Sequence, residues 1–75
     1  MSRGLHLMQL PAKKRSRLVR MARASLGLTQ AELADRIGTT PERLGRIERG
    51  EADLYLSEFV ELCLVLALRP RKHGP

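Results

Sequence analysis

Apolar and polar positions follow helical spacing along most of the chain. In three stretches the apolar residues recur three and four positions apart, which places them on one face of a helix. We expect the first helix to run from Pro11 or Ala12 to Leu26, and two shorter helices to follow it. The apolar faces are Val19, Ala22 and Leu26 in the first stretch, Leu33, Ala34 and Ile37 in the second, and Leu44 and Ile47 in the third.

The two shorter helices have clear start and stop signals. Thr29 precedes the second stretch and Glu32 follows three residues later, which is the pattern of a capping box. Thr40 and Pro41 suit the N-cap and first position of the third helix. Glycines close both helices, and only residues 38–39 separate the first helix of the pair from the cap of the next. A turn this short predicts two steeply crossing helices, the geometry of a helix-turn-helix.

A fourth helix is expected to begin between Asp53 and Ser57 and to end before Pro70. Its second half, residues 62–68, has no polar face. One small domain cannot bury every side of such a segment, so we expect a second chain to cover part of it. The expected partner surface is Leu62, Leu64, Val65, Leu66 and Leu68. Leucine at every second position also fits a β-strand, and this alternative stays open.

The rest of the chain divides into three parts. Residues 1–10 are expected to form an N-terminal arm or a short strand, residues 11–69 the helical domain, and residues 70–75 a mobile basic tail. The total of 75 residues allows one domain. Cys63 is the only cysteine, so no disulfide stabilises the domain.

Charge is distributed unevenly along the sequence. The net charge is +6, seven basic residues precede Glu32, and all eight acidic residues lie between Glu32 and Glu61. This asymmetry favours a polyanionic partner such as nucleic acid. The seven-residue apolar run at 62–68 is far shorter than the ~20 residues of a membrane-spanning helix. We therefore expect a cytoplasmic protein with no membrane partner.

Catalytic and metal-binding patterns are missing from the sequence. His6 and His73 lie near the chain ends, and Cys63 lies in an apolar run, where a small core residue is expected. No nucleophile–base set, metal-ligand spacing or glycine-rich phosphate loop appears. We expect a protein that is not an enzyme and that needs no cofactor or metal.

The segment from Leu28 to Leu68 contains a set of short motifs. They are Gly27-Leu28-Thr29-Gln30, Glu32-Leu33-Ala34, Ile37-Gly38, Leu44, and Ile47-Glu48-Arg49-Gly50, with Val19 and Arg23 in the first helix. With these motifs the segment resembles the lambda-repressor-like (Cro/XRE) helix-turn-helix family. The resemblance implies an all-α fold of four to five helices. It also implies that residues 40–49 form the recognition helix, which lies in the DNA major groove.

The family's DNA-contacting positions correspond here to Gln30, Thr40, Pro41, Glu42, Arg43 and Arg46. Independently of the family, Arg43 and Arg46 are three residues apart and share one helix face, which lies opposite Leu44 and Ile47 and is expected to be free to meet DNA. Arginine can form two hydrogen bonds to guanine, so we expect at least one of them to read a base. The resemblance also implies a partly buried ion pair between Arg23 and Glu48.

Some positions depart from the family pattern. Pro41 replaces a position that is often polar. Glu51 and Asp53 lie in the loop after the third helix, where relatives often present basic or amide groups to phosphate, so acids there should repel DNA unless they turn away. Ala67 replaces the usual glycine, and Leu64 replaces a polar residue. These departures concern the DNA-facing surface and the fourth helix.

Three functions fit the sequence. The first is a sequence-specific regulator of transcription that binds double-stranded DNA, expected to be a homodimeric repressor of a near-palindromic operator. The second is an antitoxin that binds both operator DNA and a toxin protein. The third is a protein-interaction module that keeps the fold without binding DNA.

Overall fold

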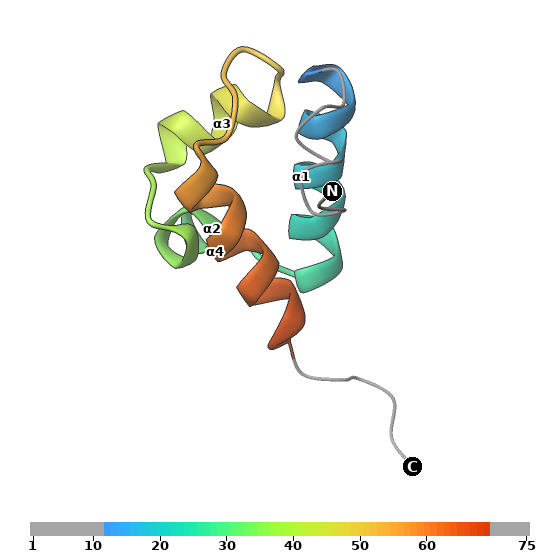
Figure 1. Ribbon diagram of the computed structural model, residues 1–75, viewed down its shortest axis with the longest axis vertical. Helices are drawn as coiled ribbons and strands as arrows, with labels where there is room; N and C mark the ends of the chain where they lie inside the picture. Colours follow the sequence, from blue (N-terminus) through green and yellow to red (C-terminus); the bar gives the residue numbers. More distant parts are fainter. Residues whose placement is uncertain (1–11, 70–75) are drawn as a thin grey trace, which may run out of the picture.

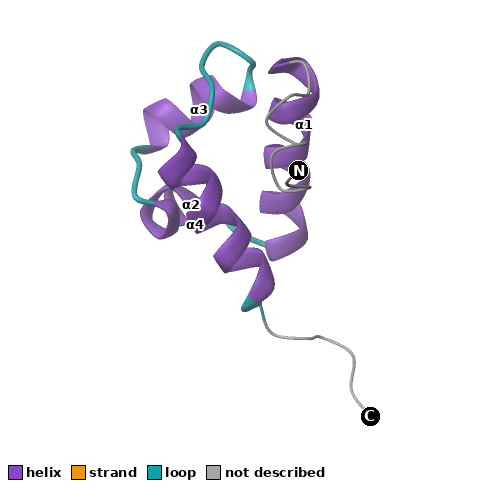
Figure 2. Cartoon of the chain, in the orientation of Figure 1, coloured by secondary structure: helices purple, strands orange, loops and turns teal. Residues whose placement is uncertain are grey.

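A computed structural model describes residues 12–69 and folds them into four α-helices (Figure 1). These are α1 (Ala12–Leu26), α2 (Gln30–Ile37), α3 (Pro41–Glu48) and α4 (Leu56–Ala67). Residues 12–69 contain no strand (Figure 2), so the all-α prediction is confirmed. The predicted arm or strand at residues 1–10 and the predicted tail at residues 70–75 lie outside the described residues.

The alternative of a strand at residues 62–68 is wrong, because residues 62–67 belong to α4 and Leu68 is its C-cap. A single strand would leave its backbone groups without partners, whereas a helix satisfies them within the segment. The alternation of leucines is therefore a by-product of a helix that is apolar on several sides.

The predicted caps set the helix boundaries. The hydroxyl of Thr29 accepts the backbone N–H of Glu32 at 3.1 Å, and the Glu32 carboxylate accepts the backbone N–H of Thr29 at 2.8 Å. Gly38 ends α2 with a φ of 76°, in the left-handed region that favours glycine. Thr40 caps α3 by accepting the Arg43 backbone N–H at 3.2 Å. The expected helix-turn-helix is thus present in the structure.

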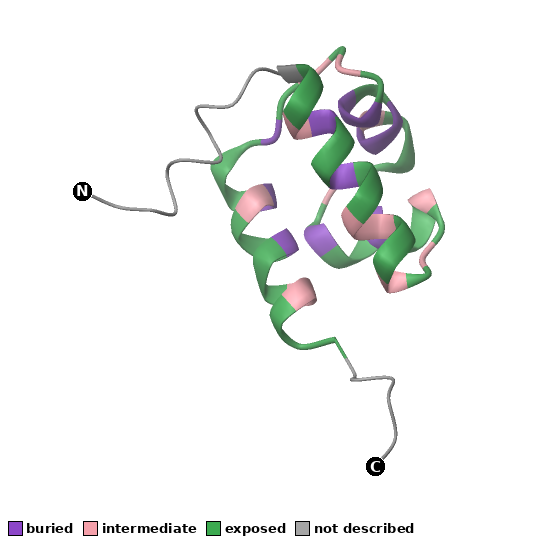
Figure 3. Cartoon of the chain, turned by 90° about the vertical axis from the view of Figure 1, so that its right-hand side faces the viewer, coloured by how far each residue is buried: buried purple, intermediate pink, exposed green. Residues whose placement is uncertain are grey.

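The helices pack around one small aliphatic core. α2 packs against both α3 and α4, and α1 packs against α3. Figure 3 shows that the buried residues lie on the inward sides of the helices. The core residues are Val19, Leu33, Ala34, Ile37, Leu44, Ile47, Leu54 and Leu62. The helical pattern of the sequence predicted most of these residues on the buried faces. Ala22 and Leu26, which were predicted there too, are half-buried and pack against the core.

The predicted partner surface on α4 needs a correction. Leu62 is buried in the core, so it is not free for a second chain, whereas Val65 and Leu66 are half-buried against the core and keep only part of their surface exposed. Leu64 and Leu68 are exposed. Together with Leu56 and Val60, which are also exposed, they recur every four residues along one side of α4. We call these four residues, 56, 60, 64 and 68, the apolar row.

The described helices are all too short or too polar to cross a membrane.

Candidate nucleic-acid interface

The beginning of α2 and one side of α3 form one surface. Residues of both helices line a shallow depression there: Gln30, Pro41, Glu42, Gly45, Arg46 and Arg49. Four of these, Gln30, Pro41, Glu42 and Arg46, are among the residues that the family resemblance places near DNA. Helix N-termini carry a partial positive charge and unpaired N–H groups, which suits contact with phosphate.

Gly45 allows the side chains of Gln30 and Arg49 to approach the backbone of α3 closely. A Cβ atom built at this position would lie 3.2 Å from an Arg49 guanidinium nitrogen and 3.8 Å from the Gln30 amide. Gln30 in turn donates from its amide to the Glu48 carboxylate at 3.0 Å. The Gln30 side chain is thereby held at the junction of α2 and α3.

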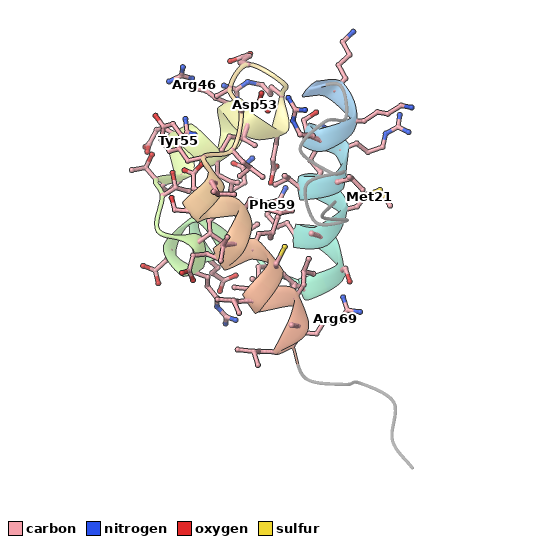
Figure 4. All side chains as sticks on the ribbon, in the orientation of Figure 1. Met21, Arg46, Asp53, Tyr55, Phe59 and Arg69 are labelled. Carbon is pink, nitrogen blue, oxygen red and sulfur yellow. The ribbon has the colours of Figure 1, made fainter. Side chains whose placement is uncertain are left out.

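Arg46 is the exposed cation of α3. Its side chain points away from the body of the molecule (Figure 4), and within residues 12–69 it makes no hydrogen bond or ion pair. Glu42 and Pro41 are exposed on the preceding turn, next to the cap residue Thr40. Arg46 is in the last turn of α3 and lines the same depression as Gln30, the first residue of α2, and an exposed guanidinium there can bind either a base edge or a phosphate.

Arg43 lies in a different environment from Arg46. Its guanidinium donates two hydrogen bonds to the Glu58 carboxylate, at 2.7 and 2.9 Å, and a third to the backbone carbonyl of Asp53 at 2.6 Å. It also stacks over the Tyr55 ring, 4.0 Å from the centroid. The sequence-based expectation that the shared face of Arg43 and Arg46 is free does not hold for Arg43, because α4 and the preceding loop occupy its donors.

Glu58 anchors this cluster. Its side chain is buried, and it also accepts the backbone N–H of Tyr55 at 2.7 Å, at the start of α4. Burial alone would raise the pKa of Glu58. Hydrogen bonds from Arg43, from the Tyr55 backbone and from Thr39 outweigh burial and lower that pKa below its ordinary value. The carboxylate therefore remains charged and ties α3 to α4.

Arg23 and Glu48 form the ion pair that the resemblance implies, between α1 and α3. The Arg23 guanidinium donates to the buried Glu48 carboxylate at 2.7 and 3.1 Å. Arg23 also donates to the Leu28 carbonyl at 3.1 Å, and Arg20 donates to the Glu48 carbonyl. Burial acts to raise the pKa of Glu48, but the hydrogen bonds from Arg23 and Gln30 lower it overall.

The acidic residues after α3 are paired within the molecule. Asp53 accepts two hydrogen bonds from Arg15 of α1, at 2.9 and 2.6 Å, across the loop that arches toward the start of α1 (Figure 1). Glu51 accepts two from Arg49, at 3.0 and 3.2 Å. The hydrogen bonds from Arg49 lower the pKa of Glu51. Pairing reduces the repulsion that these acids would exert on a phosphate backbone.

Sequence reasoning missed the cluster of Arg43, Tyr55 and Glu58. Its members are separated by a loop, and the loop path decides whether they meet. One signal was available: Glu58 is an acid three residues after the cap position of a mostly apolar helix, where it can satisfy the exposed N–H groups of the first turn. No cluster of three or more side chains able to hold a metal occurs within residues 12–69.

Comparison with known proteins gives one match. A model of the Cro/C1-type (XRE) family, described as "Helix-turn-helix", matches residues 19–72. No curated protein and no solved structure matches the chain significantly. The matched segment includes α2, α3, α4 and the part of α1 that carries Val19 and Arg23. Family members are DNA-binding regulators of transcription. With nearly three quarters of its length matched and a helix-turn-helix in its fold, the chain belongs to the Cro/C1-type helix-turn-helix family of DNA-binding transcription regulators.

Proposed function

We propose that this regulator is a homodimeric repressor that recognises a near-palindromic operator through α3. The observation that carries the proposal is the exposed guanidinium of Arg46, which makes no hydrogen bond or ion pair within residues 12–69 and lines one depression with the first residues of α2 and α3, Gln30 and Pro41. The surface offers both a cation for base edges and helix ends for phosphates, which are the two kinds of contact that specific DNA binding needs.

The residues of this surface take different roles in the proposal. Arg46 reads a base, with guanine as the favoured partner. Gln30 and Thr40 lie at helix N-termini and contact phosphates. Glu42 accompanies Arg46 at the base edges. Arg43, which the sequence placed among the base-reading residues, instead positions α3 against α4 through Glu58.

The apolar row supports the homodimer. Leu56, Val60, Leu64 and Leu68 form a continuous exposed side of α4, between 47% and 80% accessible. Rows with a spacing of four are the ridges through which two helices interlock. Packing of two α4 helices would cover the row. It would also present two copies of α3 to major grooves about 34 Å apart on one face of DNA.

The same row keeps the antitoxin function as an alternative, because a toxin protein could cover it in place of a second copy. Sedimentation of the purified chain separates the two arrangements. A stable dimer supports the homodimeric repressor. A chain that stays monomeric at micromolar concentration contradicts the homodimer and favours a different protein partner.

Selection of bound sequences from a random double-stranded DNA library tests the function directly. We expect an enriched motif with two inverted half-sites. Affinity for that motif should fall steeply with salt, because phosphate contacts release counterions. Repression is then tested by placing the motif in a reporter promoter. Recovery of no motif, with equally weak binding to all fragments, would overturn the proposal.

A further inference from the structure

The first helix carries a concentration of positive charge. α1 contains six lysine and arginine side chains and no acid. Three of the six, Lys13, Lys14 and Arg15, belong to its first turns, where the partial charge of the helix end is also positive and anions are the favourable neighbours. Such a helix is stabilised when negative groups neutralise it, either from within the protein or from a partner.

Only part of this charge is neutralised within the protein. Arg15 and Arg23 form ion pairs with acids of the loop after α3 and of α3 itself. Lys13, Lys14 and Arg17 are exposed, and their side chains make no hydrogen bond or ion pair with any residue from 12 to 69. The charge of these three side chains is therefore available to an anionic partner.

Lys13, Arg17 and Arg20 lie along one side of α1. Spacings of four and three residues place them one above another on the helix surface, and we call these three residues the basic row. The residues of α1 that line the apolar groove beside α4 include none of the three. Arg20 is exposed and donates a hydrogen bond to the backbone carbonyl of Glu48, at the end of α3. The basic row thus runs along the side of α1 that is turned toward α3 and away from α4.

The basic row adjoins the candidate nucleic-acid interface. A Cβ atom built at Gly50 would lie 3.8 Å from the hydroxyl of Ser16, so the second turn of α1 lies close to the end of α3. Arg49, next to Gly50, is exposed and lines the same depression as Arg46. Figure 1 shows the beginning of α1 beside the loop that follows α3. Exposed cations therefore continue from the end of α3 onto α1.

We propose that the basic row is a second DNA contact of this protein and binds the phosphate backbone beside the groove that α3 enters. Lysine and arginine side chains bind phosphates without regard to base sequence. Seven residues separate the ends of the row, which makes it about 10 Å long. About three phosphates of one DNA strand lie within that length of duplex. Three cations at this spacing therefore match the charge density of the strand.

This contact lies largely outside the segment that the family shares. Lys13 and Arg17 precede residue 19, where the family match begins. The proposal rests on DNA binding by the chain, and on neither the homodimer nor base recognition by Arg46. Because a phosphate contact does not depend on base sequence, it can be measured on a duplex that contains no operator. Failure to find an operator would leave this test intact.

Two double variants with the same loss of charge test the basic row. Lys13→Gln/Arg17→Gln removes one lysine and one arginine from it. Lys14→Gln/Arg36→Gln also removes one of each, but Lys14 is about 100° around the helix from Lys13, and the exposed Arg36 belongs to α2 and lines a depression beside α4. The affinity of the full chain and of both variants for a mixed-sequence DNA duplex is measured at a series of salt concentrations.

We expect the basic-row variant to bind more weakly, with a slope of log affinity against log salt that is shallower by about 1.8, or about 0.9 for each lost phosphate contact. The control variant should keep the slope of the unaltered chain. Circular dichroism before each measurement shows that the helices are intact. Equal slopes for the two double variants would overturn the proposal. If both slopes fell, the net charge of the chain would explain the effect, and if neither fell, the basic row would contact only solvent.

Discussion

The two sides of this domain differ in how completely their side chains find partners. On the side of α2, α3 and the following loop, charged side chains are tied to one another across elements, through Glu48, Glu58, Asp53 and Glu51. Within residues 12–69, no buried side-chain nitrogen or oxygen lacks a hydrogen bond. On the side of α1 and α4, apolar side chains line an open groove and an exposed row. The polar side fixes the geometry of the recognition helix, and the apolar side offers surface for further packing.

The same contrast separates two arginines on one helix. Arg43 and Arg46 are three residues apart, yet Arg43 is held by a buried carboxylate, a carbonyl and a ring, whereas Arg46 is exposed and makes no hydrogen bond or ion pair within residues 12–69. A charge that is already bonded inside the protein must break those bonds to reach DNA. The difference assigns positioning to Arg43 and recognition to Arg46.

The largest expected effect is on the polar side, at Glu48. Glu48→Ala removes the acceptor of Arg23 and Gln30 from a buried site. Loss of one partner of a fully buried ion pair costs roughly 3–5 kcal/mol. Because Arg23 keeps 27% of its side chain exposed, we expect the free energy of unfolding to fall by about 3 kcal/mol, the lower end of that range. The melting temperature should fall by about 10 °C or more. Thermal unfolding by circular dichroism measures it, with exposed Glu42→Ala as the control. Equal melting temperatures for both variants would contradict this role.

Acid should destabilise the polar side next. The pKa values of Glu48 and Glu58 lie below the ordinary value of 4.5 in the folded state. The stabilisation that the two charged carboxylates provide is therefore fully present when the pH is above their ordinary pKa. It is lost as the pH falls through their lowered pKa values in the folded state, because the carboxylates of the unfolded chain take up protons first. The melting temperature, measured at a series of pH values between about 7 and 3, should begin to fall once the pH is below about 4.5. Glu48→Gln should make that drop smaller. An unchanged pH profile in the variant would count against the network.

On the apolar side, the double variant Leu64→Gln/Leu68→Gln should weaken self-association. It removes two exposed leucines from the apolar row without touching the buried core. Analytical ultracentrifugation should show a shift toward monomer, and binding to a full operator should weaken more than binding to a half-site. Ala24→Gln, on the exposed side of α1, should leave association unchanged. If the double variant formed dimers as stable as those of the unaltered chain, the dimer interface would not include the apolar row.

The smallest expected effect concerns the loop after α3. Glu51→Gln releases Arg49, which lies in the depression beside Arg46, from its carboxylate partner. The freed cation should bind phosphate, tighten DNA binding a few-fold and steepen the slope of log affinity against log salt by about 0.9. Glu61→Gln removes the same charge from α4 and serves as the matched control. If both variants changed DNA affinity and its salt dependence equally, the effect would come from the net charge of the chain and not from the release of Arg49.

Local patterns were sufficient to predict the helices and much of the core. Thr29, Glu32 and Thr40 satisfy backbone groups within their own turns, so neighbouring residues determine those helix ends. The spacing of Leu33, Ala34 and Ile37 likewise reports the buried face of α2. The family resemblance added the prediction of the ion pair between Arg23 and Glu48, two residues that are 25 positions apart in the sequence.

Contacts between distant residues could not be predicted in this way. Whether Arg43 is free depends on how the loop after α3 brings Glu58 beside it, and nothing in the spacing of α3 encodes that path. For the same reason Leu62 was assigned to a partner surface although it completes the core. The pairing of Asp53 with Arg15 also depends on the loop, since 38 residues separate the two.

The most direct test of the division between Arg43 and Arg46 uses the operator selected from the DNA library and its single-base variants. We expect Arg46→Ala to lose discrimination at one base pair, about 1–3 kcal/mol for a bidentate contact. The double variant Arg43→Met/Glu58→Met replaces the internal ion pair by apolar side chains, and it should keep the preference of the unaltered chain at every position. If the double variant instead lost discrimination at a base pair while Arg46→Ala weakened all sequences equally, the assignment of the two arginines would be wrong.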